Sequence, residues 1–221
     1  MLFKLRKPLS KKTGSSSKFK EIVKADTIET YYDRLCETQV DDVKAVGWIN
    51  QQTQRLRFIN LSLVGDLEGK TVLDLGCGLG ALFEFIQTEE LACDYKGIDI
   101  SKKMVKRARE NYPGVSFESI DFLSKKYHSE FDFILASGAF SMPVEDPYSY
   151  LEKMIRKMLD LAKDGVAFNC LSDRSPVHLA ETRFMYYNPS KVLELALSIS
   201  PYVSISHHYL PNDFTVFIYP K

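Results

Sequence analysis

Three glycines at alternate positions follow an apolar run, and this stretch of the sequence is the best suited to bind a ligand. Residues 71–75 are Thr-Val-Leu-Asp-Leu, and residues 76–80 are Gly-Cys-Gly-Leu-Gly. The pattern predicts a strand, a tight turn and a helix that begins at position 79 or 80. Because glycine has no side chain and tolerates positive φ angles, the backbone can approach a ligand closely, and free N–H groups at the helix start point toward it. This chemistry favours a nucleoside-like cofactor.

Polar side chains lie at the carboxyl ends of the predicted strands that follow. The run 95–101 contains Asp99, roughly 20 residues after the glycines, where a ribose diol is bound in nucleotide-binding sheets. The alternating run 115–122 ends in Asp121 and Phe122, which offer an acceptor for an exocyclic amine beside an apolar surface for a purine. A fourth apolar run, 131–138, ends in Ser137 and Gly138. These side chains are expected to meet at one edge of a sheet.

Each of these features also has a purely structural interpretation. Glycines after a strand can form a turn and nothing more, Asp99 can cap the next helix in competition with Ser101, and Asp121 can be a loop carboxylate. Four strand ends in the right order nevertheless favour ligand binding over four independent coincidences.

This order of motifs resembles the class I S-adenosylmethionine-dependent methyltransferases, whose first motif is an acidic residue followed by Gly-x-Gly-x-Gly. The resemblance extends from Lys70 to a closing strand at 213–219. It implies S-adenosylmethionine as cofactor and S-adenosylhomocysteine as product. It also implies that Asp74 orders the turn and approaches the cofactor amine, and that Asp99 takes the ribose hydroxyls. The full set of cofactor-binding residues that it implies is Asp74, Gly76, Cys77, Gly78, Gly80, Asp99, Ile100, Asp121, Phe122 and Ser137, with the three glycines along the methionine part and Asp121 and Phe122 around the adenine.

The segment before the first strand carries a second, shorter resemblance. Residues 46–48 (Val-Gly-Trp) and 54–58 (Gln-Arg-Leu-Arg-Phe) are similar to the helix before the first strand in a group of small-molecule methyltransferases. That likeness implies a helix that closes over the cofactor, with Arg57 or Gln54 contacting the methionine carboxylate. A surface helix with solvated Gln and Arg side chains is the alternative.

Hydrophobic periodicity predicts one α/β domain. We expect a Rossmann-like, doubly wound sheet of seven strands, mostly parallel with an antiparallel C-terminal strand, and N-terminal capping helices. Predicted helices cover 79–87, 101–112, 147–162 and, after the cap and proline of Asn188-Pro189, the residues up to 198. A stop at 163–165 precedes a strand at 166–171, and the last two strands are 203–209 and 214–219. The domain is divided into a basic tail at 1–25, expected to be disordered, a helical lid at 26–65 and a cofactor-binding core at 66–221.

Charge and composition restrict the partners. The chain of 221 residues has 29 basic and 29 acidic residues, but seven of the basic ones lie in the first twenty positions, which leaves 22 basic against 29 acidic residues in the body. An acidic body works against phosphate binding, so we expect no nucleic-acid partner. Eighteen consecutive apolar residues do not occur, and the four cysteines form no Cys-x-x-Cys pair. We therefore expect a cytoplasmic monomer or homodimer without membrane contact.

The predicted acceptor is a small molecule with a hydroxyl, amine or carboxylate. The candidate catalytic residues are His178 and Tyr186, in the long loop before the last helix, and His208 near the final hairpin. A surface histidine, and a Tyr186-Tyr187 staple ahead of the helix, are the alternatives. Residues 137–140 (Ser-Gly-Ala-Phe) lack the Asn or Asp followed by Pro-Pro that is typical of methyltransferases acting on base amines. We also expect no metal, because Glu145 and Asp146 have no further ligand at suitable spacing.

Two other function classes stay open at this point. A nicotinamide oxidoreductase would use a similar glycine turn, but the Tyr-x-x-x-Lys at Tyr187 and Lys191 is interrupted by Asn188-Pro189 and cannot share one helical face. A non-catalytic scaffold that keeps the fold is the other alternative. Loss of cofactor binding would distinguish it, yet every expected cofactor position is intact.

Overall fold

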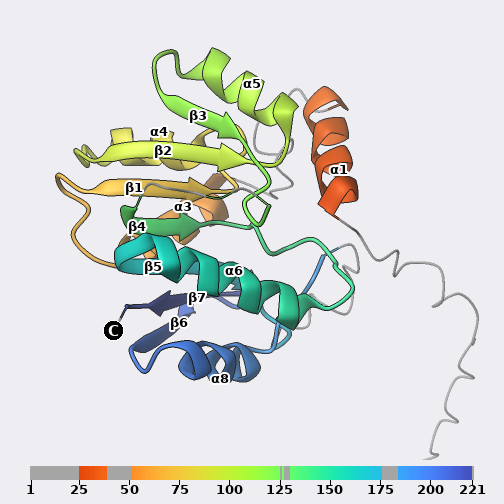
Figure 1. Ribbon diagram of the computed structural model, residues 1–221, viewed down its shortest axis with the longest axis vertical. Coiled ribbons are helices and arrows are strands. Elements are labelled where there is room, and N and C mark those ends of the chain that lie inside the picture. The colour runs from red at the N-terminus through yellow and green to blue at the C-terminus, as the bar shows by residue number, and fades with distance from the viewer. Residues whose placement is uncertain (1–24, 39–50, 125, 127–129, 176–183, 221) are drawn as a thin grey trace, which may run out of the picture.

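The computed structural model describes residues 25–38, 51–124, 126, 130–175 and 184–220. These residues form one seven-stranded sheet with helices on both faces (Figure 1). The strands are β1 Thr71–Leu75, β2 Asp94–Asp99, β3 Ser116–Ser119, β4 Phe131–Ala136, β5 Ala162–Leu171, β6 Val203–Leu210 and β7 Asp213–Ile218. The described helices are α1 Ala25–Thr38, α3 Gln51–Ser62, α4 Ala81–Thr88, α5 Lys102–Asn111, α6 Pro147–Leu161 and α8 Pro189–Ile199. The predicted doubly wound α/β sheet is confirmed.

The strand order places a ligand crevice at one point of the sheet. The order is β3-β2-β1-β4-β5-β7-β6, and only β7 runs antiparallel to its neighbours β5 and β6. Chain order reverses between β1 and β4, and ligands of open α/β sheets bind beyond the carboxyl ends of the strands at such a point. In Figure 1 the arrowheads of β1, β2 and β4 point toward the same side, on which α1 lies.

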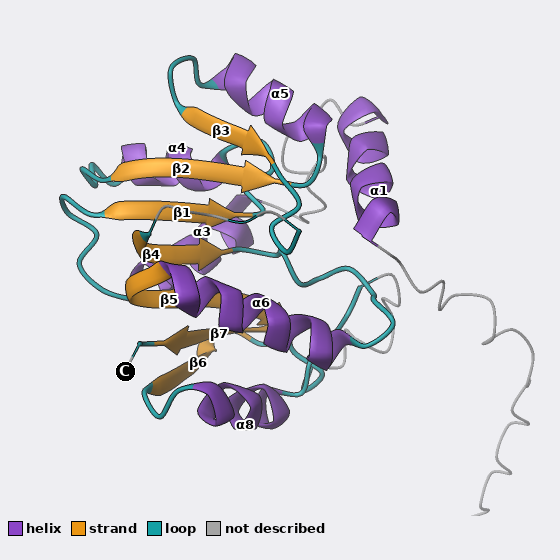
Figure 2. Cartoon of the chain, viewed as in Figure 1, coloured by secondary structure: helices purple, strands orange, loops and turns teal. Residues whose placement is uncertain are grey.

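Helices lie on both faces of the sheet (Figure 2), and each face has its own apolar core. On one face, α3, α4 and α5 pack on the sheet through residues such as Leu61, Ile86 and Ala108. On the other, α6 and α8 pack through residues such as Ile155 and Val192. Both sides of the central strands are therefore covered, which explains why β7 is buried along its whole length and β5 from Gly165 to Cys170.

Side-chain caps start three of the helices where the sequence predicted. Ser101 accepts a hydrogen bond from the backbone N of Met104 at the start of α5, and Asp146 accepts one from Ser149 at the start of α6. Asn188 caps α8 through Ser190 and Lys191, with Pro189 in the first turn. Ser101 thus takes the capping position for which Asp99 was the alternative.

Two local predictions were wrong. Residues 163–165 do not stop the chain before β5; they belong to the strand, because Phe131 pairs with Ala162 and Phe133 with Gly165. Parallel pairing with β4 overrides the local turn signal of Lys-Asp-Gly. The strand expected to reach position 122 ends at Ser119, so Asp121 and Phe122 lie in the following turn.

The N-terminal helices do not both cap the carboxyl edge. Helix α3 lies on the sheet face against α4, β5, β6 and β7, while α1 packs against α5. A buried ion pair fixes α3: Arg57 Nε lies 2.7 Å from Asp213 Oδ2 at the start of β7, and the two side chains are 5% and 2% exposed. Tyr209 donates a second hydrogen bond to Asp213, at 2.5 Å.

A second buried carboxylate joins β1 to β2. The Tyr95 hydroxyl donates to Asp74 Oδ2 at 2.7 Å, and Asp74 is 2% exposed. Burial raises the pKa of Asp74 to about 7, although the Tyr95 hydrogen bond opposes the shift and the nearby Asp99 adds to it. Asp74 therefore favours its protonated form in the folded state far more than in the unfolded chain.

Removal of Arg57 should destabilise the fold strongly. Arg57→Ala leaves the Asp213 carboxylate buried without its cation, so we expect the free energy of unfolding to fall by about 3–5 kcal/mol. Arg55→Ala is the matched control on the same helix, because Arg55 pairs with Glu89 at 2.7 Å but is 49% exposed. It should cost at most about 1 kcal/mol. Urea denaturation at neutral pH measures both, and equal losses would contradict the structural role of the buried pair.

Asp74 should make stability depend on pH. Its pKa is raised on folding to about 7 from its ordinary value of 3.8, so the unfolded chain releases the proton first and the stabilisation is lost as pH rises from about 4 through 7. Asp74→Asn keeps a hydrogen-bond acceptor for Tyr95 and should show a smaller fall in unfolding free energy across that window. Denaturation curves at pH 4 to 8 test this, with the exposed Asp94→Asn as control. Parallel pH profiles for wild type and Asp74→Asn would refute the assignment.

Candidate functional site

The turn after β1 has the backbone that the glycine pattern requires. Gly76, Gly78 and Gly80 have φ angles of +79°, +54° and +89°. The backbone N–H groups of Gly76 and Cys77 donate to the Ile98 carbonyl at 2.8 and 3.0 Å, which fastens the turn to β2. Gly80 is the N-cap of α4 and has no side-chain cap. A Cβ on Gly76 would come within 3.1 Å of the Ala139 side chain, which is tighter than ordinary contact. Glycine at this position therefore also allows the turn to pack closely against the loop after β4.

The thiol of this turn is structural. Cys77 is 6% exposed, and burial raises the pKa of its thiol well above the ordinary value, with Asp99 and Asp74 adding to the shift. A thiol held neutral in this way is a poor nucleophile. Cys77 can therefore line the turn, but it is not suited to covalent chemistry.

Asp99 at the end of β2 holds the turn in place. Its Oδ2 accepts from Gly78 N at 2.9 Å, and its Oδ1 accepts from Ser101 N at 2.8 Å. Burial raises the pKa of Asp99, while hydrogen bonds from the backbone of Ser101, Gly78 and Ile100 lower it in part. A carboxylate has about four acceptor positions, so a further donor such as a ribose hydroxyl can still bind.

Asp121 and Phe122, in the turn after β3, lie in different environments. Asp121 is exposed and accepts from Leu123 N at 3.1 Å, which is the loop-carboxylate geometry considered as an alternative. Phe122 is 4% exposed and belongs to the core that faces α6, and Lys157 Nζ lies 5.0 Å from the centre of its ring. Of these two residues, only Asp121 is exposed at the carboxyl edge. Contact of Phe122 with a purine stays a prediction.

A buried amide that the sequence reasoning missed fixes the loop after β4. Asn169, 1% exposed on β5, accepts from Gly138 N at 2.8 Å and donates to Ser137 Oγ at 3.2 Å. Ser141 in the same loop donates its hydroxyl to the Gly138 carbonyl at 2.7 Å. One polar residue within the apolar run 166–171 was the available signal, because a buried amide must have partners.

The segment before α8 crosses the ends of two strands. Met185 N donates to the Ser141 carbonyl at 2.7 Å, and Tyr187 N donates to the Leu171 carbonyl at 2.8 Å. Tyr187 is fully buried in the core, and within the described residues its hydroxyl has no hydrogen-bond partner. Tyr186, between these two anchors, is half-buried. Tyr186 is therefore held at the carboxyl edge near β4 and β5, whereas Tyr187 is a core residue.

The structure does not bring His208 to the glycine turn. His208 is exposed on β6, the outer strand, and its Nδ1 lies 3.0 Å from Ser206 Oγ. Four strand spacings separate β6 from β1, a distance of roughly 19 Å. The neighbouring His207 is also exposed, so neither histidine faces a buried side of the sheet. His178 lies outside the described residues, and so do residues 46–48.

Arg57 also has a different partner from the one expected. Its Nε is paired with Asp213, and its Nη1 donates to the Thr53 carbonyl at 3.3 Å. The reason is its position in α3, which lies on the sheet face beside β7 instead of across the carboxyl edge. Contact of Arg57 with a methionine carboxylate would have to share the side chain with this ion pair, and it stays a prediction.

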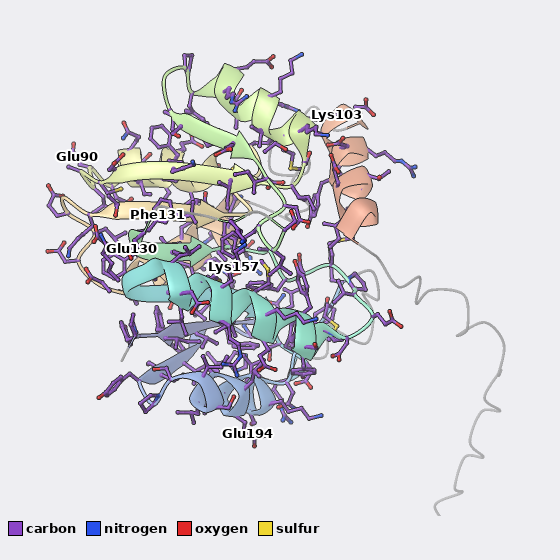
Figure 3. All side chains as sticks on the ribbon, in the orientation of Figure 1. Glu90, Lys103, Glu130, Phe131, Lys157 and Glu194 are labelled. Atoms are coloured by element: carbon purple, nitrogen blue, oxygen red, sulfur yellow. The ribbon has the colours of Figure 1, made fainter. Side chains whose placement is uncertain are left out.

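Helix α1 lies at the carboxyl edge, where a capping helix was predicted. Asp33 accepts from Ser101 Oγ at 2.5 Å, and Glu37 pairs with Lys103 at 2.5 Å, at the junction of α1 and α5 (Figure 3). Among the described residues, no three His, Cys, Asp or Glu side chains are placed to hold a metal, and no helix is long and apolar enough to cross a membrane.

These features together fit a nucleoside cofactor that carries an amino acid. The turn presents bare backbone at three positions, and Asp99 keeps acceptor capacity at the end of the neighbouring strand. Asp121 adds an exposed carboxylate one strand further along the edge.

Comparison with known proteins agrees with this geometry. The profile of a family described as "Methyltransferase domain" matches residues 66–195. Rv1506c of Mycobacterium tuberculosis, which is named as a methyltransferase, is 26% identical over 164 residues, covering 72% of this chain and 98% of that protein.

Two solved structures share the fold. Magnesium protoporphyrin IX methyltransferase of Synechocystis PCC 6803, with bound S-adenosylmethionine, has a TM-score of 0.64 at 18% identity, over 91% of this chain and 99% of that chain. The N-methyltransferase NodS of Bradyrhizobium japonicum, in complex with S-adenosylhomocysteine, has a TM-score of 0.62 at 15% identity, over 87% of this chain and 97% of that chain.

The family match spans more than half of the chain, and it decides against the nicotinamide oxidoreductase considered from the sequence. The glycine turn with its positive φ angles and the strand order, which reverses between β1 and β4, agree with the fold of the solved methyltransferases. This chain belongs to the methyltransferase domain family, and it is a class I S-adenosylmethionine-dependent methyltransferase.

Proposed function

We propose that the methyl acceptor is a small molecule with a hydroxyl, amine or carboxylate, and that it binds between the loop after β4 and residues 185–187. The observation that carries this proposal is the pair of backbone hydrogen bonds that join Met185 to Ser141 and Tyr187 to Leu171. They anchor residues 185–187 across the carboxyl ends of β4 and β5, on the far side of β1 from Asp99. The sequence between β5 and α8 is long, and long connections inside compact domains are commonly binding elements.

The cofactor would be held on the other side of this edge. Asp99 would accept from the ribose hydroxyls, the backbone of Gly76, Gly78 and Gly80 would line the methionine part, and Asp121 would accept from the adenine amine. Asp74 is buried and bonded to Tyr95, so its contribution is to hold β1 against β2 beneath the turn. When bound, S-adenosylmethionine supplies an electrophilic methyl group on a positively charged sulfur.

The chain's own residues have three tasks in such a transfer. They must align the acceptor with the methyl group, exclude water, and take a proton where the acceptor is a hydroxyl. The loop after β4 is rigid because Asn169 and Ser141 fix Gly138 from two sides, which suits the first task. Helix α1 covers the carboxyl edge near β2 and suits the second. For the third, we propose His178 and Tyr186.

Nucleic acid is a poor candidate for the acceptor. The acidic body argues against phosphate binding, and the loop after β4 has Ser-Gly-Ala-Phe at 137–140 in place of a Pro-Pro motif. The relatives named above act on magnesium protoporphyrin IX or as an N-methyltransferase. We do not assign these activities to this chain. Both are compatible with a fold in which the loops that bind the acceptor differ between proteins.

Asp99 should be required for cofactor affinity. Asp99→Ala removes an acceptor for the ribose and also leaves the Gly78 N–H without its partner, so binding of S-adenosylmethionine should weaken by about 1–3 kcal/mol. Isothermal titration with the purified protein measures the change. Asp94→Ala, an exposed carboxylate at the start of the same strand, is the control and should bind as wild type does. Equal affinity in Asp99→Ala and wild type would remove Asp99 from the cofactor site.

The acceptor proposal is tested by turnover. A panel of small hydroxyl, amine and carboxylate compounds is incubated with enzyme and S-adenosylmethionine, and formation of S-adenosylhomocysteine is followed. With an acceptor that works, Tyr186→Phe should lower kcat/KM by about 2- to 10-fold, the loss of one hydrogen bond, while cofactor affinity is unchanged. Tyr202→Phe, 58% exposed, is the control.

Two results would contradict this placement of the acceptor. One is full activity of both Tyr186→Phe and His178→Ala, which would move the acceptor away from the loop before α8. The other is methylation of DNA or RNA, but of no small molecule, by protein that lacks residues 1–20.

A further inference from the structure

Tyr32 of α1 lies over the glycine turn, where it packs on Leu79. Its hydroxyl lies near the side chain of Ser141 in the loop after β4, and it interacts electrostatically with the Asp99 carboxylate at the end of β2. Strands β2 and β4 are the two neighbours of β1. A side chain that reaches both must cross the carboxyl end of β1, where the turn begins.

Apolar packing places the ring of Tyr32 at the same point. Tyr32 and Cys36 pack on Leu79 and Met104, and Leu79 is part of the glycine turn itself. The ring also contacts Tyr31 edge-on, with 5.3 Å between the ring centres. Tyr32 is therefore fixed from three directions: by Ser141 at its hydroxyl, by Leu79 and Met104 beneath it, and by Tyr31 beside it.

Helix α1 is held in this position by contacts of its own. Asp33, the next residue, accepts from Ser101 Oγ at 2.5 Å and from Lys103 N at 3.4 Å. Arg107 donates to the Cys36 carbonyl at 3.5 Å, and Lys103 pairs with Glu37. Because Ser101 follows Asp99 by two residues, α1 is attached to the same strand end that holds the turn.

The phenol of Tyr32 is suited to binding a cation and not to proton abstraction. Burial raises its pKa far above the ordinary value, and the nearby Asp99 adds to the shift, so the hydroxyl stays neutral at any working pH. A neutral tyrosine ring attracts cations through its π-face, and this attraction grows when water is excluded.

We propose that Tyr32 is a cofactor-contacting residue whose ring lies against the sulfonium of S-adenosylmethionine. In that molecule the sulfonium joins the ribose to the methionine part. If Asp99 binds the ribose and the glycine turn lines the methionine part, as proposed above, the group between them is the sulfonium, and Tyr32 is the aromatic side chain between Asp99 and the turn. The contact discriminates charge: it favours the positively charged cofactor over the neutral thioether product, S-adenosylhomocysteine.

The test compares affinity for the two forms of the cofactor and needs no acceptor. The dissociation constants of S-adenosylmethionine and S-adenosylhomocysteine are measured by titration for wild type, Tyr32→Leu and Tyr32→Phe. In Tyr32→Leu, affinity for S-adenosylmethionine should fall about 3- to 30-fold more than affinity for S-adenosylhomocysteine. Tyr32→Phe keeps the ring and should keep the wild-type ratio. Tyr202→Leu makes the same change at an exposed tyrosine before β6, away from the site, and should also keep it.

Other outcomes separate the alternatives. An unchanged ratio in Tyr32→Leu overturns the proposal, because Tyr32 then acts only in packing. A Tyr32→Phe variant that behaves like Tyr32→Leu also overturns it, because the hydroxyl and not the ring would be responsible. If Tyr32→Leu lowers the melting temperature, it is replaced by Tyr32→Met, whose longer, unbranched side chain adapts better to the space left by the ring. Wild-type protein that binds neither compound would refute the cofactor-site assignment, and not the role of Tyr32 alone.

Discussion

The carboxylate of Asp99 is the contact on which the arrangement of the site depends. It accepts hydrogen bonds from the backbone N of Gly78, in the glycine turn, and from the backbone N of Ser101, the N-cap of α5. Ser101 in turn donates its hydroxyl to Asp33 of α1. One buried charge thus connects the turn after β1, the start of α5 and the N-terminal helix. Such a charge is tolerated only because each of its oxygens accepts hydrogen bonds, since an unpaired carboxylate at this depth would be costly.

A second centre lies in the loop after β4. Ser141 donates its hydroxyl to the Gly138 carbonyl, its own carbonyl accepts from Met185 N, and its side chain lies near the Tyr32 hydroxyl. The two segments that cover the carboxyl edge, α1 and the residues before α8, therefore meet at this loop.

The end of the sheet formed by β7 and β6 contributes to stability. The buried Arg57–Asp213 pair, with Tyr209 and Thr215, fastens α3 to the hairpin of β6 and β7. Arg57 and Asp213 are charged and buried, a combination that is also common at catalytic sites. Their location on the sheet face and outer strands gives them a different use. A perturbed pKa, such as that of Asp213, raised to about 6 by burial, does not by itself mark an active site.

The sequence determined the fold class, the order of strands and helices along the chain and the position of the glycine turn, because these depend on local signals. A glycine turn needs positive φ, a capped helix needs Ser101 or Asn188, and an apolar run in alternation with helices gives a parallel sheet. Only the tertiary structure decided the partners of long side chains and the end points of strands. Arg57 pairs with Asp213, which is 156 positions away in the chain, and residues 163–165 belong to β5 because this strand pairs with β4. It also decided that His208 lies on the outer strand and that Tyr32 lies over the turn, because contacts between segments distant in sequence leave no periodic pattern to read.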